Sequence, residues 1–213
     1  MILQLFTLIG ALGMFLYGMN FMSTGLQKAS GDKLRGILTS MTSNPFKRVL
    51  TGLGITALVQ SSSATTVLVV SFVNAGLLTL VQAVGIIMGA NIGTTLTAWV
   101  TAVGFSVDIS AFSVPLMILG FILTNSKKQQ YKNIGEFIVG FALMFLGLSF
   151  MKSSAGTLLS NKDAMMAFFS HFTEFGFGSD LIFLLAGTIL TIVLQASSAT
   201  MAITMLLTTS GLI

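Results

Sequence analysis

Two polar stretches interrupt the most apolar parts of this sequence, and they constrain its fold more than any other feature. Residues 60–66 read Gln-Ser-Ser-Ser-Ala-Thr-Thr within an apolar run from about Val49 to Leu80. A second stretch, Gln-Ala-Ser-Ser-Ala-Thr at 195–200, lies in another apolar run. A polar group in hydrocarbon without a partner costs several kcal/mol, so such groups need cover from protein or water. One serine pair would more often reflect close helix packing, but the doubled motif predicts a site.

The composition indicates a membrane protein. The chain of 213 residues is 54% hydrophobic and 8% charged, whereas a soluble domain carries about 25% charged residues. Apolar segments of helical length that contain Gly, Ser and Thr predict an all-α bundle in the lipid bilayer of the cell membrane, and not a β-barrel. The absence of cysteine excludes disulfides and thiolate metal sites. We attribute the net charge of +4 to topology and lipid contact, and expect no nucleic-acid partner.

The apolar segments divide into a first unit at residues 1–135 and a second unit at 136–213. The segment 52–78 is too short for two spans of about 20 residues each and is polar at its centre, so we interpret it as a re-entrant helical hairpin. The expected elements of the first unit are a helix at 2–22, a basic loop at 23–50, the hairpin at 52–78, and helices at 81–103 and 111–124. Those of the second unit are a helix at 136–151, a polar linker at 152–180 and a hairpin at 181–213.

The two units repeat each other in sequence. Residues 52–78 and 187–213 are identical at nine of 27 aligned positions, which include both glutamines. The first helix repeats too, because Gly10 matches Gly140 and Met-Phe-Leu follows four residues after each of them. Each unit therefore consists of a helix, a polar linker and a hairpin.

The basic residues predict the direction of the two units. If the first hairpin re-enters, eight of the ten basic residues lie on one side of the membrane, in loops at 23–50 and 126–134, as expected for the cytoplasmic side. Two crossings, the helices at 81–103 and 111–124, then separate the first helices of the two units, so these two helices run in opposite directions and the repeats are inverted. Inverted repeats with broken helices are typical of secondary transporters whose site lies at the bilayer midplane where the two breaks meet. We therefore expect the two hairpin tips to approach each other there.

A hairpin broken at its tip offers groups that bind ions. The first N–H groups of the returning half-helix carry partial positive charge, and hydroxyls beside them add donors for an anion. Carbonyl and side-chain oxygens of such broken helices can coordinate Na⁺. The candidate anion ligands at the two tips are Gln60, Ser61, Ser62, Ser63, Gln195, Ser197 and Ser198. The candidate sodium ligands are the neighbouring hydroxyl and amide residues Thr65, Thr66, Asn91, Thr94, Thr95 and Thr200.

Other functions for polar residues at this depth deserve comparison. An intramembrane serine hydrolase needs a base beside its nucleophile. The single histidine, His171, lies in the polar linker, and no lysine lies near either serine run, so we expect no enzyme activity. Polar hairpins can also line a channel. The residues leave open a channel or a transporter of another small anion.

The doubled Gln-Ser-Ser motif, together with Gly-Ala-Asn-Ile-Gly-Thr-Thr at 89–95, makes the chain similar to the sodium/phosphate cotransporter family, the type II group and its bacterial relatives. The resemblance covers nearly the whole chain. It implies uptake of inorganic phosphate driven by Na⁺ through two inverted repeats. It also implies that the two tips contact phosphate or Na⁺, with Na⁺ as the coupling ion and no cofactor.

Two departures from the family pattern add further expectations. Family members usually carry a second Asn-Gly-Thr element after the second hairpin, but this sequence stops at Ile213. We therefore expect a missing C-terminal partner segment or a homodimer. Ala196 stands where the first tip has Ser61, so we expect the two hairpins to differ in their ligand contacts.

The inverted topology predicts that cysteines placed at 23–50 and at 153–180 react from opposite sides of the membrane. The chain has no native cysteine, so single-cysteine variants treated with a membrane-impermeant thiol reagent report each region directly. Reaction of both regions from the same side would contradict the inverted topology.

Overall fold

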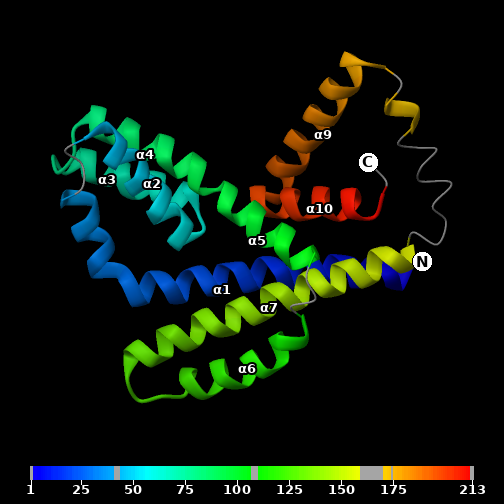
Figure 1. Cartoon of the computed structure of the whole chain (residues 1–213), viewed down its shortest axis with the longest axis horizontal. Helices are drawn as coiled ribbons and strands as arrows, with labels where there is room; N and C mark the ends of the chain where they lie inside the picture. The colour runs from blue at the N-terminus through cyan, green and yellow to red at the C-terminus, as the bar shows by residue number, and fades with distance from the viewer. Residues whose placement is uncertain (1, 41–43, 107–109, 159–169, 174, 212–213) are drawn as a thin grey trace.

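The computed structural model describes residues 2–40, 44–106, 110–158, 170–173 and 175–211, and these residues form helices and turns without a strand (Figure 1). The main helices are α1 (Ile2–Ser40), α2 (Pro45–Val59), α3 (Ser62–Asn74), α4 (Leu80–Gly93), α5 (Thr95–Ser106), α6 (Ser110–Thr124), α7 (Gln129–Leu158), α9 (Phe177–Leu194) and α10 (Ser197–Thr209). Four helical stretches are long and apolar enough to cross a membrane: Leu3–Ala29, Leu80–Ser106, Gln129–Gly156 and Phe177–Leu194. The chain is therefore an all-α, multi-pass membrane protein, as its composition predicts.

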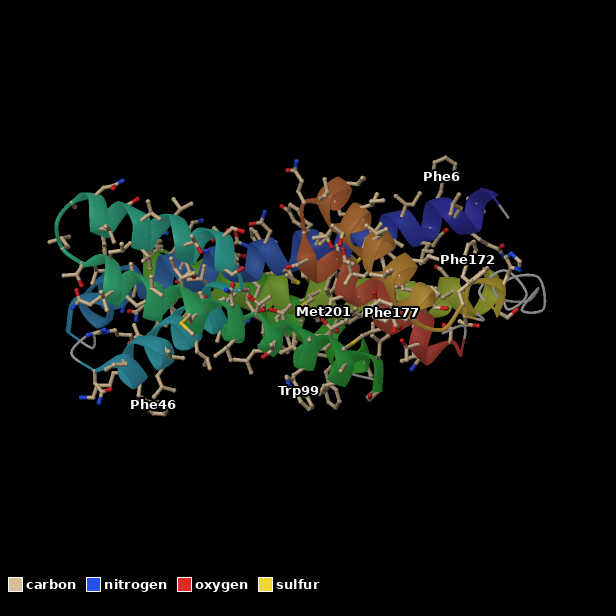
Figure 2. All side chains as sticks on the ribbon, turned by 90° about the horizontal axis from the view of Figure 1, so that it is seen from above. Phe6, Phe46, Trp99, Phe172, Phe177 and Met201 are labelled. Carbon is tan, nitrogen blue, oxygen red and sulfur yellow. The ribbon has the colours of Figure 1, made fainter. Side chains whose placement is uncertain are left out.

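Large apolar side chains cover the outside of the molecule. Phe6, Phe46 and Trp99 are each about two-thirds exposed, at 67%, 68% and 69%. Figure 2 shows them pointing away from the helices. Apolar surface on this scale would be unfavourable in water. It is the surface expected for contact with lipid.

Helix α1 is longer than the sequence indicated. The expected basic loop at 23–50 is wrong over its first part, because α1 continues to Ser40. Polar residues alone do not end a helix, and the first proline of the chain, Pro45, begins α2. Near the start of this polar part, α1 contacts α7 through an ion pair of 2.7 Å between Lys28 and Glu136.

Helix α7 shows the same difference. It spans Gln129–Leu158, beyond both ends of the expected helix at 136–151. The expected linker at 152–180 is therefore shorter, because α7 takes its first residues and α9 begins at Phe177. The remaining linker positions 159–169 and 174 lie outside the described residues.

Helices α1 and α7 pack together through glycines whose missing Cβ atoms allow backbone contact. A Cβ at Gly18 would overlap the backbone nitrogen of Met144, and one at Gly147 would meet the backbone nitrogen of Phe15. Early residues of one helix meet late residues of the other, so the helices are antiparallel. Gly147 follows Gly18 by the same 129 positions as Met144 follows Phe15. The interface is thus self-complementary, as in a contact across a two-fold axis.

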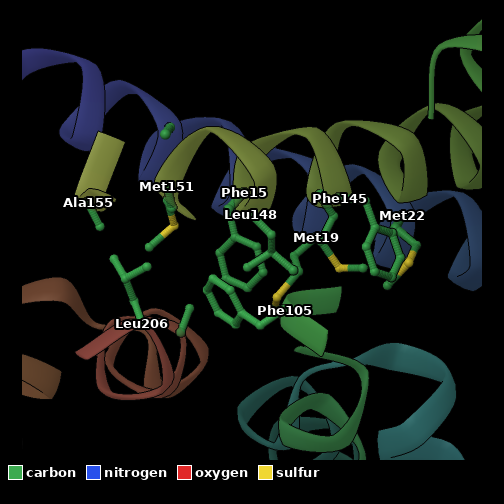
Figure 3. Packing of buried hydrophobic residues seen from close by; sticks show 12 residues of the cluster. Phe15, Met19, Met22, Phe105, Phe145, Leu148, Met151, Ala155 and Leu206 are labelled. Carbon is green, nitrogen blue, oxygen red and sulfur yellow. The ribbon is translucent and has the colours of Figure 1, made fainter. Parts of the chain in front are cut away.

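The main core forms where other elements reach this helix pair. Phe15 and Leu148 are almost fully buried between α1 and α7. Figure 3 shows Phe105 from α5 and Leu206 from α10 pointing into the same cluster. Helix α10 of the second hairpin is therefore anchored on the same core as α5.

The first hairpin folds back as expected, but it begins at Pro45 and not at Gly52. A Cβ at Gly52 would overlap the Ile86 carbonyl oxygen, and one at Gly89 would overlap the Val49 carbonyl oxygen. A Cβ at Gly85 would meet the Arg48 side chain, and one at Gly93 would meet the Leu53 carbonyl oxygen, so the two helices advance together and α2 is parallel to α4. Helix α3, which connects the end of α2 to the start of α4, must therefore run in the opposite direction.

The expected helix at 81–103 is interrupted. It divides into α4 and α5 at Thr94, although Leu80–Ser106 as a whole keeps the length of a span. Helix α6 matches the expected helix at 111–124 to within one residue and includes Pro115. It packs on α7, where Gly120 approaches Val139.

The second hairpin has a different environment. It consists of α9 and α10 and begins at Phe177, four residues before the expected start. Only 6% of α9 is buried within the molecule. Gly187, the sequence counterpart of Gly52, has no described atom within 4 Å of its Cβ position. Helix α2 of the first hairpin packs against α4 and α1, whereas α9 projects from the molecule (Figure 1).

The packing of α2 on α4 predicts different effects for two neighbouring glycines. Gly52→Ala should destabilise the protein by about 1–3 kcal/mol because the new methyl group overlaps backbone atoms of α4. Gly54→Ala is the matched control on the same helix, since its Cβ would meet no atom within 4 Å; it should be neutral or stabilise by about 0.5–1 kcal/mol. Thermal unfolding in detergent measures both effects. Equal midpoints for the two variants would contradict this packing.

Candidate anion site between the two hairpin tips

The two hairpins break with the same backbone conformation. Gln60 has φ 55° and ψ 23°, and Gln195 has φ 51° and ψ 25°, both in the left-handed region. The next residues, Ser61 and Ala196, are extended, with φ of −147° and −145°. Among the described residues, these two glutamines are the non-glycine residues with positive φ. The sequence repeat at the tips is therefore also a repeat of local structure.

A pair of threonines connects the two halves of each hairpin. The Thr56 hydroxyl donates to the Thr65 hydroxyl at 3.0 Å, and the hydroxyls of Thr191 and Thr200 lie 2.9 Å apart. Each pair joins the last turn before the break to the first turn after it. These hydrogen bonds fix the angle between the half-helices at both tips.

The two tips line one cavity of about 180 Å³. Its lining residues are Gln60, Ser61, Ser62, Ser63, Thr94, Thr97, Gln195, Ala196, Ser197 and Ser198. All seven candidate anion ligands are included, so the two tips lie close together, and the binding of an anion by these residues stays a prediction. All but one of the lining residues are polar and none is charged. The start of α10 lies beside α5 (Figure 1), and α5 contributes Thr97 to the lining of the cavity.

The backbone groups at the first tip are largely bonded to protein. The carbonyl oxygen of Val59 accepts a hydrogen bond from the Ser23 hydroxyl of α1. The side-chain nitrogen of Gln60 donates to the Ala57 carbonyl oxygen at 2.5 Å. The Ser61 hydroxyl accepts from the Ala64 N–H at 3.2 Å and caps α3. The carbonyl end of α2 is therefore less open to a cation than the sequence suggested.

The second tip is less restrained. Ala196 is the N-cap residue of α10 and has no side chain to cap it. The Gln195 side chain is exposed and makes no hydrogen bond within the described part of the chain. This difference follows from the Ser61 to Ala196 replacement and from the absence of an α5 counterpart beside α9 among the described residues.

The structure does not gather the candidate sodium ligands. Thr94 lines the cavity, but its hydroxyl donates to the Ala90 carbonyl oxygen at 3.2 Å. The Asn91 side chain is exposed, away from the cavity lining. The remaining candidates, Thr65, Thr66, Thr95 and Thr200, bond to helix carbonyls or to a threonine across the break. A threonine in an apolar helix commonly donates its hydroxyl to a carbonyl oxygen of its own helix. For this reason, closeness to the motif in sequence did not identify which threonines line the cavity.

Thr97 is the lining residue that sequence reasoning missed. It lies about one helical turn after Thr94, and both residues line the cavity. The Thr97 hydroxyl donates to the Gln60 side-chain oxygen at 2.8 Å. The spacing from Thr94 is the sequence signal that could have identified it. Within the described residues, no cluster of His, Cys, Asp or Glu could hold a metal ion.

The shared cavity predicts that the two tips can be cross-linked. Cysteines at Ser62 and Ser197 should be joined by a short bifunctional thiol reagent because both residues line the same cavity. The control pairs Ser62→Cys with Thr188→Cys, since Thr188 lies on α9 outside this lining. A shift in electrophoretic mobility after mild proteolysis between the tips measures the link. Linking of both pairs to the same extent would show that the tips do not define one cavity.

Comparisons with known proteins identify the family. The Na⁺/Pi-cotransporter family matches residues 14–153, which include the first tip and end before the second. YjbB of Escherichia coli (strain K12), described as a candidate inorganic phosphate export protein, is 31% identical over 212 residues, which are 99% of this chain. YqeW of Bacillus subtilis, an uncharacterized protein, is 29% identical over 93% of this chain and 62% of its own length. The human sodium-dependent phosphate transport protein 2B is 40% identical over 112 residues, or 51% of this chain and 16% of its own.

The chain spans only 37% of the length of the Escherichia coli relative. No solved structure gives a significant match. The family match covers more than half of the chain and contains both motifs that make up the first part of the cavity. The chain therefore belongs to the Na⁺/Pi-cotransporter family.

Proposed function

We propose that the cavity between the tips is the substrate site of a transporter that couples Na⁺ to the uptake of inorganic phosphate. The observation that carries this proposal is the convergence of two Gln-Ser-Ser tips on one uncharged cavity. Membership of the Na⁺/Pi-cotransporter family supports phosphate as the substrate. The name of the human relative supports sodium dependence, whereas the name of the Escherichia coli relative points to export. The direction of transport is therefore part of the test.

The chemistry of the cavity suits an oxyanion. Serine hydroxyls supply donors that can rotate toward phosphate oxygens. The first N–H groups of α3 and α10 add partial positive charge. Helix α10 is the more open of the two because Ala196 provides no capping oxygen. No lysine or arginine lines the cavity, so these neutral donors must share the negative charge of the ligand.

The neutral lining gives a reason for coupling to Na⁺. An anion of one or two charges is costly to bury without a compensating cation. A Na⁺ bound nearby would lower this cost, so each ion should favour binding of the other. We propose Thr94 and the free amide oxygen of Gln195 as cation ligands. Thr65 and Thr200 contribute indirectly, because their hydroxyls join the two halves of each hairpin. Thr66, Asn91 and Thr95 are candidate Na⁺ ligands that do not line the cavity.

Alternating access requires two units that exchange positions around the site. The antiparallel packing of α1 on α7, with related contacts on both helices, supports an inverted repeat. The equal backbone angles at the two tips support it as well. We propose that the units 1–135 and 136–213 are these two repeats.

The proposed site predicts that Ser63→Ala and Ser198→Ala each weaken phosphate binding. A lost hydrogen bond to a charged ligand costs about 1.5–3 kcal/mol, which raises the phosphate concentration for half-maximal uptake by about tenfold to a hundredfold. The effect should deepen when Na⁺ is lowered. Uptake of radiolabelled phosphate into proteoliposomes, with Na⁺ gradients of either direction, measures affinity, coupling and direction together.

Ser71→Ala is the matched control for these variants. Ser71 lies on α3, outside the cavity lining, and its hydroxyl donates to the Val67 carbonyl oxygen at 2.8 Å. It should retain the wild-type phosphate requirement. A flux that does not saturate with phosphate and Na⁺ together would indicate a channel. Wild-type affinity in both Ser63→Ala and Ser198→Ala would show that the serines only pack the helices.

A further inference from the structure

We propose that Thr97 is a positioning residue that holds the acceptor oxygen of Gln60 away from the ligand, so that the first tip presents donors to the anion. This inference rests on the proposed function. The Thr97 hydroxyl donates to Gln60 Oε1 at 2.8 Å across a sequence separation of 37 residues. It connects α5 to the break between α2 and α3, two elements that no other described side-chain hydrogen bond joins.

The amide of Gln60 is held at both of its ends. Its oxygen accepts from Thr97, and its nitrogen donates to the Ala57 carbonyl oxygen at 2.5 Å. Reversing the amide would bring its oxygen against that carbonyl oxygen, and the two acceptors would repel each other. A primary amide has two N–H groups. Because only one of them is used by Ala57, the second remains as a donor on a residue that lines the cavity.

The position of Thr97 gives its hydroxyl a single direction. The residue is 5% exposed, and its backbone N–H donates to the Thr94 carbonyl oxygen at 3.1 Å. A threonine in a helix commonly donates to the carbonyl oxygen one turn earlier, as Thr101 does to Thr97. Thr97 instead directs its one proton to Gln60. This departure from the local pattern indicates a specific role for its hydroxyl group.

Gln195 shows that the break alone does not restrain the amide. It has the same left-handed backbone conformation as Gln60 and lines the same cavity. Its side chain has no partner within the described residues. The restraint on Gln60 therefore comes from Thr97 and Ala57. The two glutamines, equivalent in the repeat, are expected to differ in function: Gln60 is a fixed donor, and Gln195 can turn either end toward a ligand.

Removal of the Thr97 hydroxyl should separate the effects on the two ions. In Thr97→Val, which keeps the volume of the side chain, Gln60 Oε1 loses its donor and turns toward the cavity. A carbonyl oxygen there repels phosphate oxygens but can coordinate Na⁺. The dissociation constant for phosphate should rise tenfold or more, and that for Na⁺ should stay unchanged or fall. A general structural disturbance would weaken the binding of both ions.

The experiment measures binding by the purified chain in lipid nanodiscs. Radiolabelled inorganic phosphate is titrated at fixed Na⁺, and radiolabelled Na⁺ is titrated in the absence of phosphate, so that coupling between the ions does not change the dissociation constant for Na⁺. Thr97→Ser retains the hydroxyl and should bind phosphate as the wild type does. Thr101→Val is the matched control on the same helix. It removes a buried hydroxyl whose hydrogen bond goes to the Thr97 carbonyl oxygen and not to Gln60. Thermal unfolding is recorded for each variant.

A second variant keeps the inference testable if Thr97→Val does not fold. Gln60→Met removes the amide that Thr97 holds, so adding Thr97→Val to it should have no further effect on phosphate binding. An additional loss in the double variant would overturn the inference. Equal weakening by Thr97→Val and Thr97→Ser, or wild-type binding by Thr97→Val, would overturn it too. Failure of the wild-type chain to bind phosphate would instead contradict the proposed function itself.

Discussion

The structure depends on how the chain satisfies backbone groups where helices stop inside apolar surroundings. Each break leaves carbonyl groups at the end of one half-helix and N–H groups at the start of the next. In hydrocarbon these groups need partners from the protein. At the first tip, Ser23 of α1 bonds to Val59, and Gln60 bonds to Ala57 through its own side chain. The requirement for partners thus ties the tip to a neighbouring helix and determines its position.

Glycine contacts carry the rest of the architecture. Backbones meet directly where α1 crosses α7 and where α2 lies along α4. The first of these contacts supports the core that anchors α5 and α10, and the second supports the first hairpin, which breaks at Gln60. The cavity is therefore bounded by a densely packed hairpin on one side and by a hairpin with an exposed α9 on the other. The two halves of the site have related sequences but unequal support.

The sequence predicted the features that depend on pattern and repetition. The polar residues at 60–66 and 195–200 located both breaks, and the repeat implied that the tips converge. Helix ends were harder to predict, because residues 23–40 are polar but contain no proline to stop α1. The repeat of the first helices was matched at Gly10 and Gly140, 130 positions apart, whereas the contacts of α1 with α7 relate positions 129 apart. Short matches in apolar sequence do not fix register, but backbone contacts do.

The role of individual hydroxyls also required the structure. Threonines occur throughout the apolar helices, and most donate to a carbonyl oxygen of their own helix. Sequence alone does not distinguish these from Thr97, whose partner lies 37 residues earlier. For the same reason, Thr65 and Thr200 were expected as cation ligands, but the structure places them in the hydrogen bonds that brace the hairpins.

The backbone at the tips indicates how much the glutamines matter. Each hairpin adopts the left-handed conformation twice, at the break and again after the returning half-helix. At the second position the residue is glycine, Gly76 or Gly211, each with φ 70°. At the break it is glutamine, although the left-handed region costs a residue with a Cβ about 1–2 kcal/mol. The chain has glycine where only the backbone must turn, so a glutamine at each break indicates that its side chain, and not the backbone alone, is needed there.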